Sequence, residues 1–361
     1  MTAPEDVSGL EHLLEMGKIQ AEDIIGIIAQ TEGTGYARGY ASLCMQILLS
    51  KYLQISPEAV FDRIPMMMIG LCGGLMSPHY TVFVRQQFSQ LPPHLSPPSE
   101  KRLAVGIADT RVLLPEEYGT LTQVNLVAEA VERAIANAGI LDLEDVHCVE
   151  VKCPAMTPAR IIDAENRGAT VVSPQLNQAS VLSKAASALG IALALQEISA
   201  TQVTDDTILK DASLYTERGS VSAGGEQSAC RVIVMGNSAR SLSRYRVGHG
   251  VMNDQLDTLG IYSALTSAGL ECRLPLTSEQ QARITQVFVN CGADATTAVR
   301  QRRHTIHSDF LSGYAGIMAK AVANAIVAAV VGDTMILASA GNEHQGKRGS
   351  NLVAAIVQVE P

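Results

Sequence analysis

Tryptophan is absent from this chain of 361 residues, which contains only five phenylalanines and nine tyrosines. Hydrophobic residues nevertheless make up 47% of the sequence. The core must therefore be built mainly from alanine, valine, isoleucine, leucine and methionine. At this length we expect two or three domains and ample chain to bury a core.

Charge is also scarce: charged residues make up 17% of the chain, and the net charge is −9. Since the only basic run is residues 301–304, we do not expect a nucleic-acid partner. The longest apolar run, residues 321–331, is too short to cross a bilayer. Residues 1–6 are acidic and lack the features of a signal peptide. We therefore expect a cytoplasmic protein without a membrane partner.

Several signatures of metal and cofactor chemistry are missing as well. The seven cysteines are dispersed without CxxC spacing, which is typical of reduced thiols rather than of a disulfide framework. No strand is followed by GxGxxG, and neither a P-loop nor a GxSxG elbow is present. Residues 304–309 read H-x-x-H-x-D and could chelate a metal, but the sequence marks no distant third ligand. We expect no metal and no cofactor.

What the chain does contain is a repeated motif, S-A-G-x-E. It occurs at residues 222–226 and again at 339–343, each time beside a short apolar run. A turn of small residues with one hydroxyl at the edge of a strand can offer a nucleophile and backbone N–H groups to a ligand. Two copies in one chain indicate an internal repeat.

Two further elements support three repeats. Residues 67–74 resemble a third glycine turn, with Ile69 in the place of the serine and Gly73 in the place of the glutamate. Upstream of each turn an alanine-rich helical segment opens with one cation, and these cations are Arg38, Lys184 and Lys320. Before each of these segments an apolar strand ends in a polar residue, at 24–30, 149–152 and 287–290.

The order of strand, cationic helix and glycine turn thus occurs three times and predicts an α+β fold. We expect three similar units, at residues 1–100, 101–243 and 244–361, around a pseudo-threefold axis on which the turns converge. Their sheets are expected to form a central barrel-like core. The four prolines of segment 90–100 mark a linker, and residues 237–244 mark the second junction.

Hydrophobic periodicity places the main elements. We predict helices at 9–18, 36–53, 121–138, 183–197, 254–268 and 314–331. We predict strands at 23–29, 64–69, 103–108, 146–152, 231–235, 286–290, 334–339 and 353–359.

A serine hydroxyl needs a base before it becomes a good nucleophile, and no histidine stands at a repeated position. A lysine can serve if burial lowers its pKa. Lys152 ends an apolar strand in the same unit as Ser222, which would let the two side chains meet. Alternatively, Lys152 is an ordinary strand-end lysine paired with Glu150, and Ser222 and Ser339 are merely small residues in tight turns.

These residues resemble a known family, the cyanuric acid hydrolases and barbiturases, which are ring-opening amidohydrolases. The resemblance covers nearly the whole chain. The segments that carry it are 31–35, 75–79, 151–154, 187–194, 247–252 and 343–346. It implies three units around one axial active site, with three Lys–Ser pairs and three basic residues that hold the ring oxygens. It also implies hydrolysis of a cyclic amide by the pair of the second unit.

Compared with the family, this chain keeps only part of that site. The second unit keeps both members of its pair, Lys152 and Ser222. In the first unit the lysine is replaced by Gln30 and the serine by Ile69. In the third unit Asn290 replaces the lysine, while Ser339 is kept.

Other family features are changed too. The family arginine is kept at Arg38, whereas in the other two units it is replaced by a lysine, Lys184 or Lys320. Some members bind a structural divalent ion through a glutamate that aligns with Gly292, and the tail at 347–350 also differs, so we expect no such ion here. The resemblance further implies a homo-oligomer, most simply a tetramer.

The resulting hypothesis is a ring-opening amidohydrolase with Lys152 as base and Ser222 as nucleophile. Backbone N–H groups near Gly70, Ala223 and Ala340 would hold the oxyanion. If the family nucleophile instead abuts the glycine, its counterpart is Ala223 and the chain is inert. Ile69 disfavours a threefold-symmetric ring, so the expected substrate is barbiturate-like or a less symmetric cyclic amide or imide. The alternatives are an inactive protein that binds a small ring, and a Ser–Lys amidase acting on linear amides.

Overall fold

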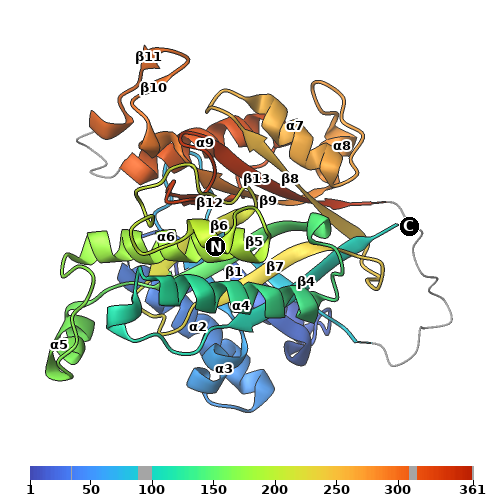
Figure 1. The fold of residues 1–361 in the computed structure, drawn as a ribbon. Coiled ribbons are helices and arrows are strands. Elements are labelled where there is room, and N and C mark those ends of the chain that lie inside the picture. The colour runs from blue at the N-terminus through green and yellow to red at the C-terminus, as the bar shows by residue number, and fades with distance from the viewer. Residues whose placement is uncertain (34, 88–99, 309–314, 360–361) are drawn as a thin grey trace.

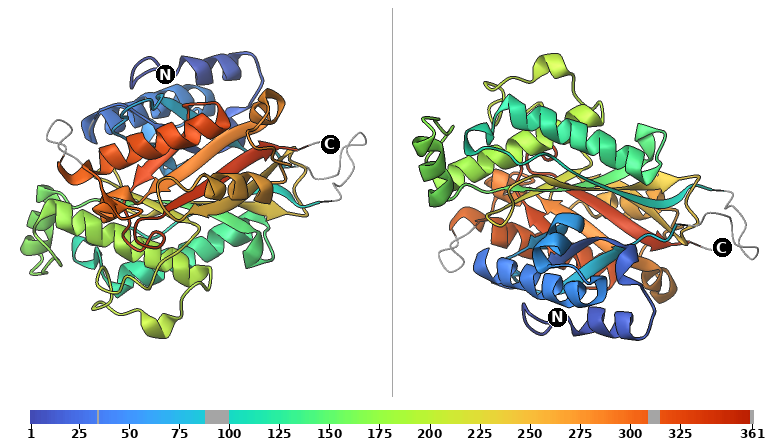
Figure 2. Two further views of the ribbon diagram at one scale, coloured as in Figure 1. Left: turned by 90° about the horizontal axis from the view of Figure 1, so that it is seen from above. Right: turned by 90° about the horizontal axis from the view of Figure 1, so that it is seen from below.

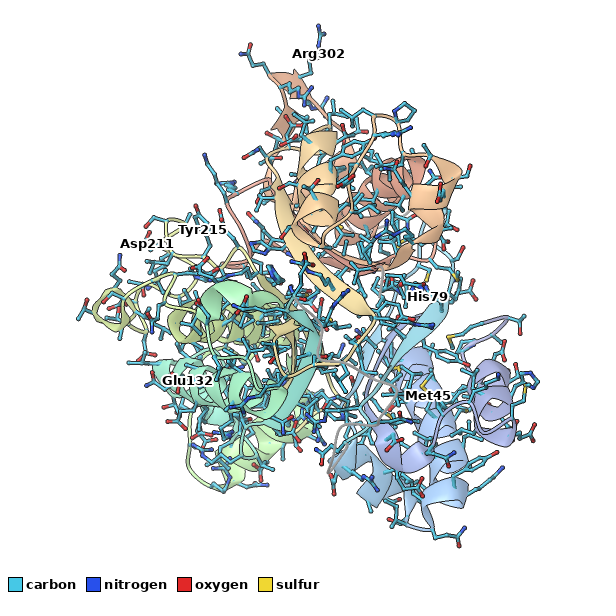
Figure 3. All side chains as sticks on the ribbon, turned by 90° about the vertical axis from the view of Figure 1, so that its right-hand side faces the viewer. Met45, His79, Glu132, Asp211, Tyr215 and Arg302 are labelled. Carbon is cyan, nitrogen blue, oxygen red and sulfur yellow. The ribbon has the colours of Figure 1, made fainter. Side chains whose placement is uncertain are left out.

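The structure, a computed structural model, describes residues 1–33, 35–87, 100–308 and 315–359 (Figure 1). Its strands form three main sheets and one small hairpin, β10 (Ala298–Val299) with β11 (Arg302–Arg303). The predicted linker at 90–100 lies outside the described residues except for Glu100. Seen from the side, the blue, green and orange segments form three lobes around a shared centre (Figure 3).

The first sheet has the order β2-β1-β3. Its strands are β1 (Ile24–Gln30), β2 (Met66–Ile69) and β3 (His79–Val84). Its helices are α1 (Ser8–Glu15), α2 (Gly35–Leu53) and α3 (Pro57–Arg63), with the 3-10 turn η1 (Ala21–Asp23). Leu10 of α1 and Met45 of α2 are buried in one cluster with the side chains of β1 and β2.

The second sheet has the order β4-β7-β5-β6. Its strands are β4 (Arg102–Asp109), β5 (Val146–Pro154), β6 (Gly219–Gly224) and β7 (Arg231–Ser238). Its helices are α4 (Leu121–Ala138), α5 (Pro158–Asn166) and α6 (Leu176–Ala194), with the turns η2 (Pro115–Glu117), η3 (Leu143–Asp145) and η4 (Ala200–Gln202). The long helices α4 and α6 pack against each other and cover this sheet.

The third sheet has the order β12-β9-β13-β8. Its strands are β8 (Tyr245–Met252), β9 (Ile284–Cys291), β12 (Leu337–Ala340) and β13 (Asn351–Gln358). Its helices are α7 (Thr258–Ser267), α8 (Ser278–Ala282) and α9 (Ala315–Val331), with the turns η5 (Ala293–Ala295) and η6 (Ile306–Ser308). Viewed from above, α9 and α7 lie over this sheet, between the blue and green segments (Figure 2).

The same strand pairing recurs in all three sheets. A middle strand pairs in parallel with one neighbour and antiparallel with the other: β1 with β2 and β3, β5 with β6 and β7, and β9 with β12 and β13. In the second and third sheets a further strand, β4 or β8, pairs antiparallel with β7 or β13. The recurrence of one topology accounts for the repeated sequence elements.

The space between the sheets is filled by side chains from all three of them. Ile28, Ile233 and Phe288 lie in this one buried cluster. Among the described residues the sheets remain three separate open sheets, so the predicted barrel-like core is wrong. A closed barrel would need backbone strand pairing between the sheets, whereas here the sheets meet through apolar packing and a few side-chain hydrogen bonds.

Several predicted elements also need correction. The S-A-G segments are not turns, because residues 222–224 lie in β6 and residues 339–340 in β12. Helix α6 begins seven residues earlier than predicted, at Leu176, and α7 begins four residues later, at Thr258. The sequence patterns did not indicate the helices α3, α5 and α8 or the strands β3, β6, β8, β10 and β11. In β8, Gly248 and Gly250 obscured the strand pattern; both lie so close to α7 that a Cβ would meet its backbone.

Candidate active site

The three predicted pairs of site residues are direct partners in the three parallel ladders. The partners are Gln30 with Ile69, Lys152 with Ser222, and Asn290 with Ser339. Register partners in neighbouring strands point to the same face of a sheet, so each pair presents its two side chains together. The strand that carries Ser339, β12, contacts both β2 and β6, which brings the three pairs to one place.

Lys152 is fully buried. Its Nζ donates a hydrogen bond to the Met68 carbonyl oxygen at 2.9 Å and lies 4.0 Å from Glu226 Oε1. Burial lowers the pKa of Lys152 to about 8, although Glu226 acts in the opposite direction. Lys152 is therefore not a surface lysine paired with Glu150, and an appreciable fraction of it is neutral near physiological pH.

Ser222 is half-buried beside this lysine. Among the described residues no hydrogen bond joins the Ser222 hydroxyl to Lys152 Nζ, whose hydrogen bond goes to Met68 instead. Catalytic hydrogen bonds are often long or misaligned without substrate and tighten when it binds. A nucleophilic role for Ser222 therefore requires that substrate binding turn the two side chains toward each other.

The three predicted cations lie in three different environments. Lys184 Nζ forms an ion pair with Glu343 Oε1 at 2.6 Å; burial opposes its charge, but Glu343 raises its pKa overall. Lys320 Nζ donates to the Gly70 carbonyl oxygen at 2.6 Å, and burial lowers its pKa to about 8. The Arg38 side chain packs against Gly70, where an added Cβ would meet its Cδ at 2.8 Å, and the buried Arg38 Nε has no hydrogen-bond partner within the described ranges.

The glutamate of the S-A-G-x-E motif lies at the site and was not among the predicted site residues. Glu226 approaches Lys152, and Glu343 binds Lys184. Both carboxylates fold back over the motif glycine, where a Cβ would collide with them. In the first unit the glutamate is replaced by Gly73, and no ion pair of Lys320 is present in the part of the chain that the structure describes. The repetition of the glutamate beside each serine was the available signal.

Two amide side chains of the site connect different units, and a third bonds within its own unit. Gln30 Oε1 accepts from the Ala338 N–H at 2.9 Å, which joins β1 to β12. Gln345 Oε1 accepts from the Val221 N–H at 2.6 Å, which joins the third unit to β6. Asn290 Nδ2 donates to the Gly341 carbonyl oxygen at 2.8 Å. The remaining predicted positions, Ala223 and Ala340, each follow a motif serine and are partly exposed.

The residues near Gly292 do not fit the divalent ion that the resemblance implies. A Cβ at Gly292 would collide with the Ser350 carbonyl, so there is no room for a glutamate. Asn342 Nδ2 instead donates to the carbonyl oxygens of Gln345, at 2.8 Å, and of Gly346 and Lys347, both at 3.4 Å. The Asn342 amide group thus donates to carbonyl oxygens that would otherwise be available as ligands for a cation.

The other candidate metal segment is residues 304–309. The rings of His304 and His307 are stacked with centroids 6.3 Å apart, and Asp309 lies outside the described residues. Within the described ranges no three or more histidine, cysteine, aspartate or glutamate side chains are grouped so that they could hold a metal ion.

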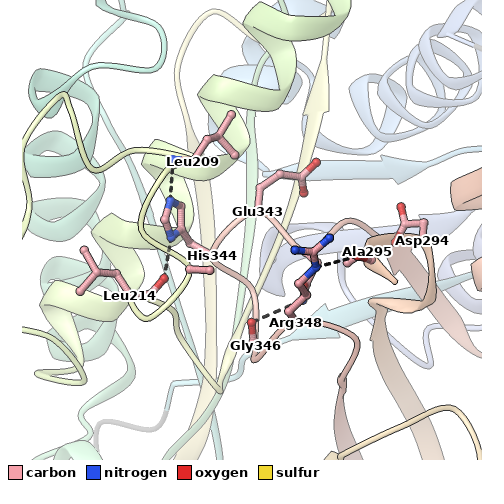
Figure 4. Close-up of a pocket in the computed structure, with 10 residues that line it drawn as sticks. Leu209, Leu214, Asp294, Ala295, Glu343, His344, Gly346 and Arg348 are labelled. Atoms are coloured by element: carbon pink, nitrogen blue, oxygen red, sulfur yellow. Dashed lines mark hydrogen bonds between the residues drawn. The ribbon is translucent and has the colours of Figure 1, made fainter. Parts of the chain in front are cut away.

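A cavity of about 380 Å³ adjoins the site at Glu343 (Figure 4). Asp294 and Arg348 also line it, and His344 forms part of its wall. The His344 ring is fixed, because Nε2 accepts from the Leu209 N–H at 2.8 Å and Nδ1 donates to the Leu214 carbonyl at 2.5 Å. Neither Lys152 nor Ser222 lines this cavity, so its link to the site is the Glu343–Lys184 ion pair.

The fold and the site define a three-sheet α/β protein with a buried lysine and a serine paired on adjacent strands. A family model described as "Amidohydrolase ring-opening protein" matches residues 1–358. The chain is 41% identical to a cyclic amide hydrolase of Azorhizobium caulinodans, with 99% of this chain and 97% of that protein aligned. It is 37% identical to Barbiturase 1 of a Nocardioides species, over 98% and 95% of the two chains.

A solved structure agrees with these similarities. A cyanuric acid hydrolase, described as an evolutionary innovation by structural concatenation, superposes with a TM-score of 0.91 at 38% identity. The comparison covers 99% of this chain and 97% of that one. The chain belongs to the ring-opening amidohydrolase family, as the sequence resemblance indicated.

Proposed function

We propose that this protein hydrolyses a C–N bond of a small cyclic amide or imide, with Ser222 as the nucleophile and Lys152 as the base. The observation that carries the proposal is the pairing of Ser222 with a fully buried lysine whose pKa is about 8. A base with a pKa near the working pH is well suited to proton transfer. The named activities of the relatives, on cyclic amides, cyanuric acid and barbiturate, support the same class of substrate.

The reaction begins when neutral Lys152 takes the Ser222 hydroxyl proton as the serine oxygen attacks a ring carbonyl. Backbone N–H groups near Gly70, Ala223 and Ala340 stabilise the oxyanion, and one such donor is typically worth about 3 kcal/mol. As the tetrahedral intermediate collapses, the ring C–N bond breaks and the Lys152 ammonium gives its proton to the leaving nitrogen. Water then cleaves the acyl-serine ester, which releases a ring-opened acid and restores both side chains.

The other two pairs supply binding rather than chemistry in this proposal. Asn290 and Ser339 are polar, and the cations Arg38, Lys184 and Lys320 surround the ring carbonyls. Ile69, only 6% exposed, presents an apolar surface at the remaining position. A ring carbonyl left unpaired there would cost about 1–3 kcal/mol. We therefore propose a barbiturate-like or less symmetric ring, with an apolar edge or substituent toward Ile69, in preference to cyanuric acid.

A substrate panel with matched serine variants tests this proposal. Ser222→Ala should abolish ring opening, whereas Ser339→Ala, the same change in the other S-A-G-x-E motif, should mainly raise KM. Equal loss in both variants would contradict the assignment of the nucleophile. Equal kcat/KM for cyanuric acid and barbiturate would contradict the substrate preference.

A second candidate is a protein that binds a small ring without cleaving it, and the loss of two of the three Lys–Ser pairs favours it. An acylating probe distinguishes the two candidates. Peptide mass analysis should find the probe on Ser222 of the wild type and on no serine of Lys152→Ala. The absence of labelling in folded wild-type protein would favour the binding protein. Hydrolysis of a linear half-amide as fast as of its cyclic imide would instead indicate an open amidase site.

We also infer that residues 1–100, 101–243 and 244–361 are three units related by a pseudo-threefold axis. The support for this axis comes from contacts that lead from one unit to the next. Lys152 of the second unit bonds to Met68 of the first unit, the residue just before Ile69. Gln30 of the first unit bonds to Ala338 of the third, just before Ser339. Two of the three corresponding residues, Lys152 and Gln30, therefore contact equivalent positions of a neighbouring unit, through a carbonyl oxygen in one case and an N–H in the other.

We further propose a homo-oligomer, with a tetramer as the simplest form, working in the cytoplasm. One face of α2 exposes Tyr36, Tyr40, Leu43 and Ile47, with 95%, 51%, 44% and 44% of each residue's surface accessible. Their spacing puts all four on one apolar stripe. Ile47→Asp should lower the mass measured by light scattering, whereas Val112→Asp, another exposed apolar site, should not. An unchanged mass in Ile47→Asp would rule out this interface.

The cytoplasmic assignment rests on the cysteines, all seven of which are free thiols. In the part of the chain that the structure describes, no helix has both the length and the apolar character needed to cross a membrane.

A further inference from the structure

A small cavity lies one layer below the catalytic pair, between the second and third sheets. It has a volume of about 20 Å³, and its lining includes Glu150 of β5, Ser220 of β6 and Asn290 of β9. Glu150 and Ser220 each precede a catalytic residue by two positions in the same strand, so they point to the same face as Lys152 and Ser222. A cavity of this size holds one particle as large as a water molecule.

The repeat explains why this space is hollow. Lys152 reaches across to the Met68 carbonyl, next to Ile69, in the neighbouring unit. Asn290 is the register counterpart of Lys152, and the counterpart of Met68 is Val221, next to Ser222. The Asn290 side chain is too short for that contact, and its Nδ2 bonds instead to Gly341 of its own sheet. The cavity beside Ser220 is thus the room that an ammonium head would occupy if residue 290 were a lysine.

The side chains around this cavity present oxygen atoms, and the amide oxygen of Asn290 lacks a donor. Asn290 is 2% exposed, and its buried Oδ1 has no hydrogen-bond partner within the described residues. Glu150 is 5% exposed, and its carboxyl is hydrogen-bonded to the Ser220 side chain and, at a long 3.9 Å, to the Cys148 thiol. None of the ion pairs among the described residues includes Glu150, so no basic side chain lies within ion-pair distance of its carboxyl. Burial accordingly raises the pKa of Glu150 to about 8, against the opposing effects of Ser220 and Lys152.

No charged side chain nearby takes the place of the ammonium that a lysine at position 290 would bring into the cavity. Arg218 also lines the cavity, but its Nε is paired with Glu197 at 3.0 Å, and its NH1 donates to the Leu143 carbonyl at 2.7 Å. His147 is neutral, because burial lowers its pKa to about 3. Glu217 adds a negative charge at the exposed end of the lining. The carboxyl of Glu150 and the amide oxygen of Asn290 therefore face a hollow with the geometry, but not the charge, of an ammonium site.

We propose that this cavity binds one monovalent cation of the size of K⁺ or NH₄⁺, between the oxygen atoms of Glu150, Asn290 and Ser220. Oxygen ligands are those preferred by hard cations. On binding, the cation takes the place of the Glu150 carboxyl proton, which passes to the solvent, so the charge in the cavity is balanced. Asn290 is shared with the proposed ring-binding site, but the tests of the cation site use no substrate, so they can succeed or fail independently of the ring-opening activity.

A crystallographic test uses the whole protein with Rb⁺ as the probe. Crystals grown in about 0.2 M RbCl should show an anomalous peak between Glu150 and Asn290. The peak should be absent from Glu150→Gln, which removes the negative charge but keeps the shape. A peak of ordinary water density with no anomalous signal in the wild type would overturn the proposal.

A stability test separates this site from general effects of salt. At constant ionic strength, replacing choline chloride by KCl or NH₄Cl should raise the melting temperature of the wild type by about 1–2 °C. Asn290→Lys carries its own ammonium into the cavity, so its melting temperature should be independent of the cation. Glu132→Gln, the same charge change on the exposed face of α4, should respond like the wild type. A wild-type melting temperature that is the same in all three salts would also overturn the proposal.

Discussion

The burial of Lys152 makes a quantitative prediction for Lys152→Met, which replaces the amine by an unbranched apolar chain. Burial lowers the pKa from its usual 10.5 to about 8, and one pKa unit corresponds to about 1.4 kcal/mol. Keeping the ammonium in the folded protein therefore costs roughly 3 kcal/mol below pH 8. The substitution removes that cost but leaves the Met68 carbonyl unpaired, which costs about 1 kcal/mol. We expect Lys152→Met to be more stable than the wild type by about 2 kcal/mol at pH 7.

The stability advantage of Lys152→Met should depend on pH in a defined direction. Between pH 8 and 10.5 the unfolded chain binds more protons than the folded one, so wild-type stability rises with pH in this window. The advantage of Lys152→Met should be constant below pH 8 and vanish near about pH 9.5, where the wild type has regained roughly 2 kcal/mol. Urea denaturation followed by circular dichroism at both pH values measures this difference.

Lys51→Met serves as the control, because Lys51 is exposed in the last turn of α2 and should change stability little at either pH. If Lys152→Met were no more stable than the wild type at pH 7, or if its advantage persisted at high pH, Lys152 would not be a buried amine with a lowered pKa. Loss of activity with a gain in stability is the expected signature of a residue kept for function.

Three further predictions concern other parts of the molecule. His147 Nδ1 and His249 Nδ1 are 2.8 Å apart, and burial lowers their pKa values to about 3 and about 4. The stability of the folded protein should therefore fall as the pH falls below 6.5, the pKa of histidine in the unfolded chain. In denaturation experiments between pH 7 and 5, His249→Gln should make this dependence of stability on pH less steep. Gly341→Ala puts a Cβ at φ +135° against the Glu343 carboxylate, so it should cost about 1–3 kcal/mol in stability and raise KM. Ile69→Ser restores a hydroxyl at this position. In competition assays, kcat/KM for symmetric, carbonyl-rich rings should rise about tenfold relative to kcat/KM for less symmetric rings.

The repeated features of the site could be predicted from sequence because they recur. The three imperfect copies of one pattern marked the strand ends and the glycine segments, and the family resemblance paired residue 30 with 69 and residue 290 with 339. The structure makes these pairs, and the pair of residues 152 and 222, register partners. Burial of Lys152 was also predictable, since it ends a continuous apolar run. Local patterns, internal symmetry and the family resemblance together thus predicted which residues lie side by side.

Features that depend on contacts between units could not be predicted in the same way. The ion pair between Lys184 and Glu343 joins residues 159 positions apart, and no local pattern marks such a contact. The three open sheets were mistaken for a barrel because strand patterns do not reveal which edges pair. The glycines of β8 hid a strand, because their role is to let α7 approach, which is a property of the packed molecule.

The most direct test of the central claim is a hydrolysis assay on a panel of cyclic imides and amides, including barbiturate and cyanuric acid, with Lys152→Ala and Ser222→Ala in parallel. We expect the wild type to open at least one ring and either substitution to lower kcat by about 10⁴-fold or more. Full activity in either folded variant, or no activity of the wild type on any ring, would contradict the assignment of Lys152 and Ser222 as a catalytic pair.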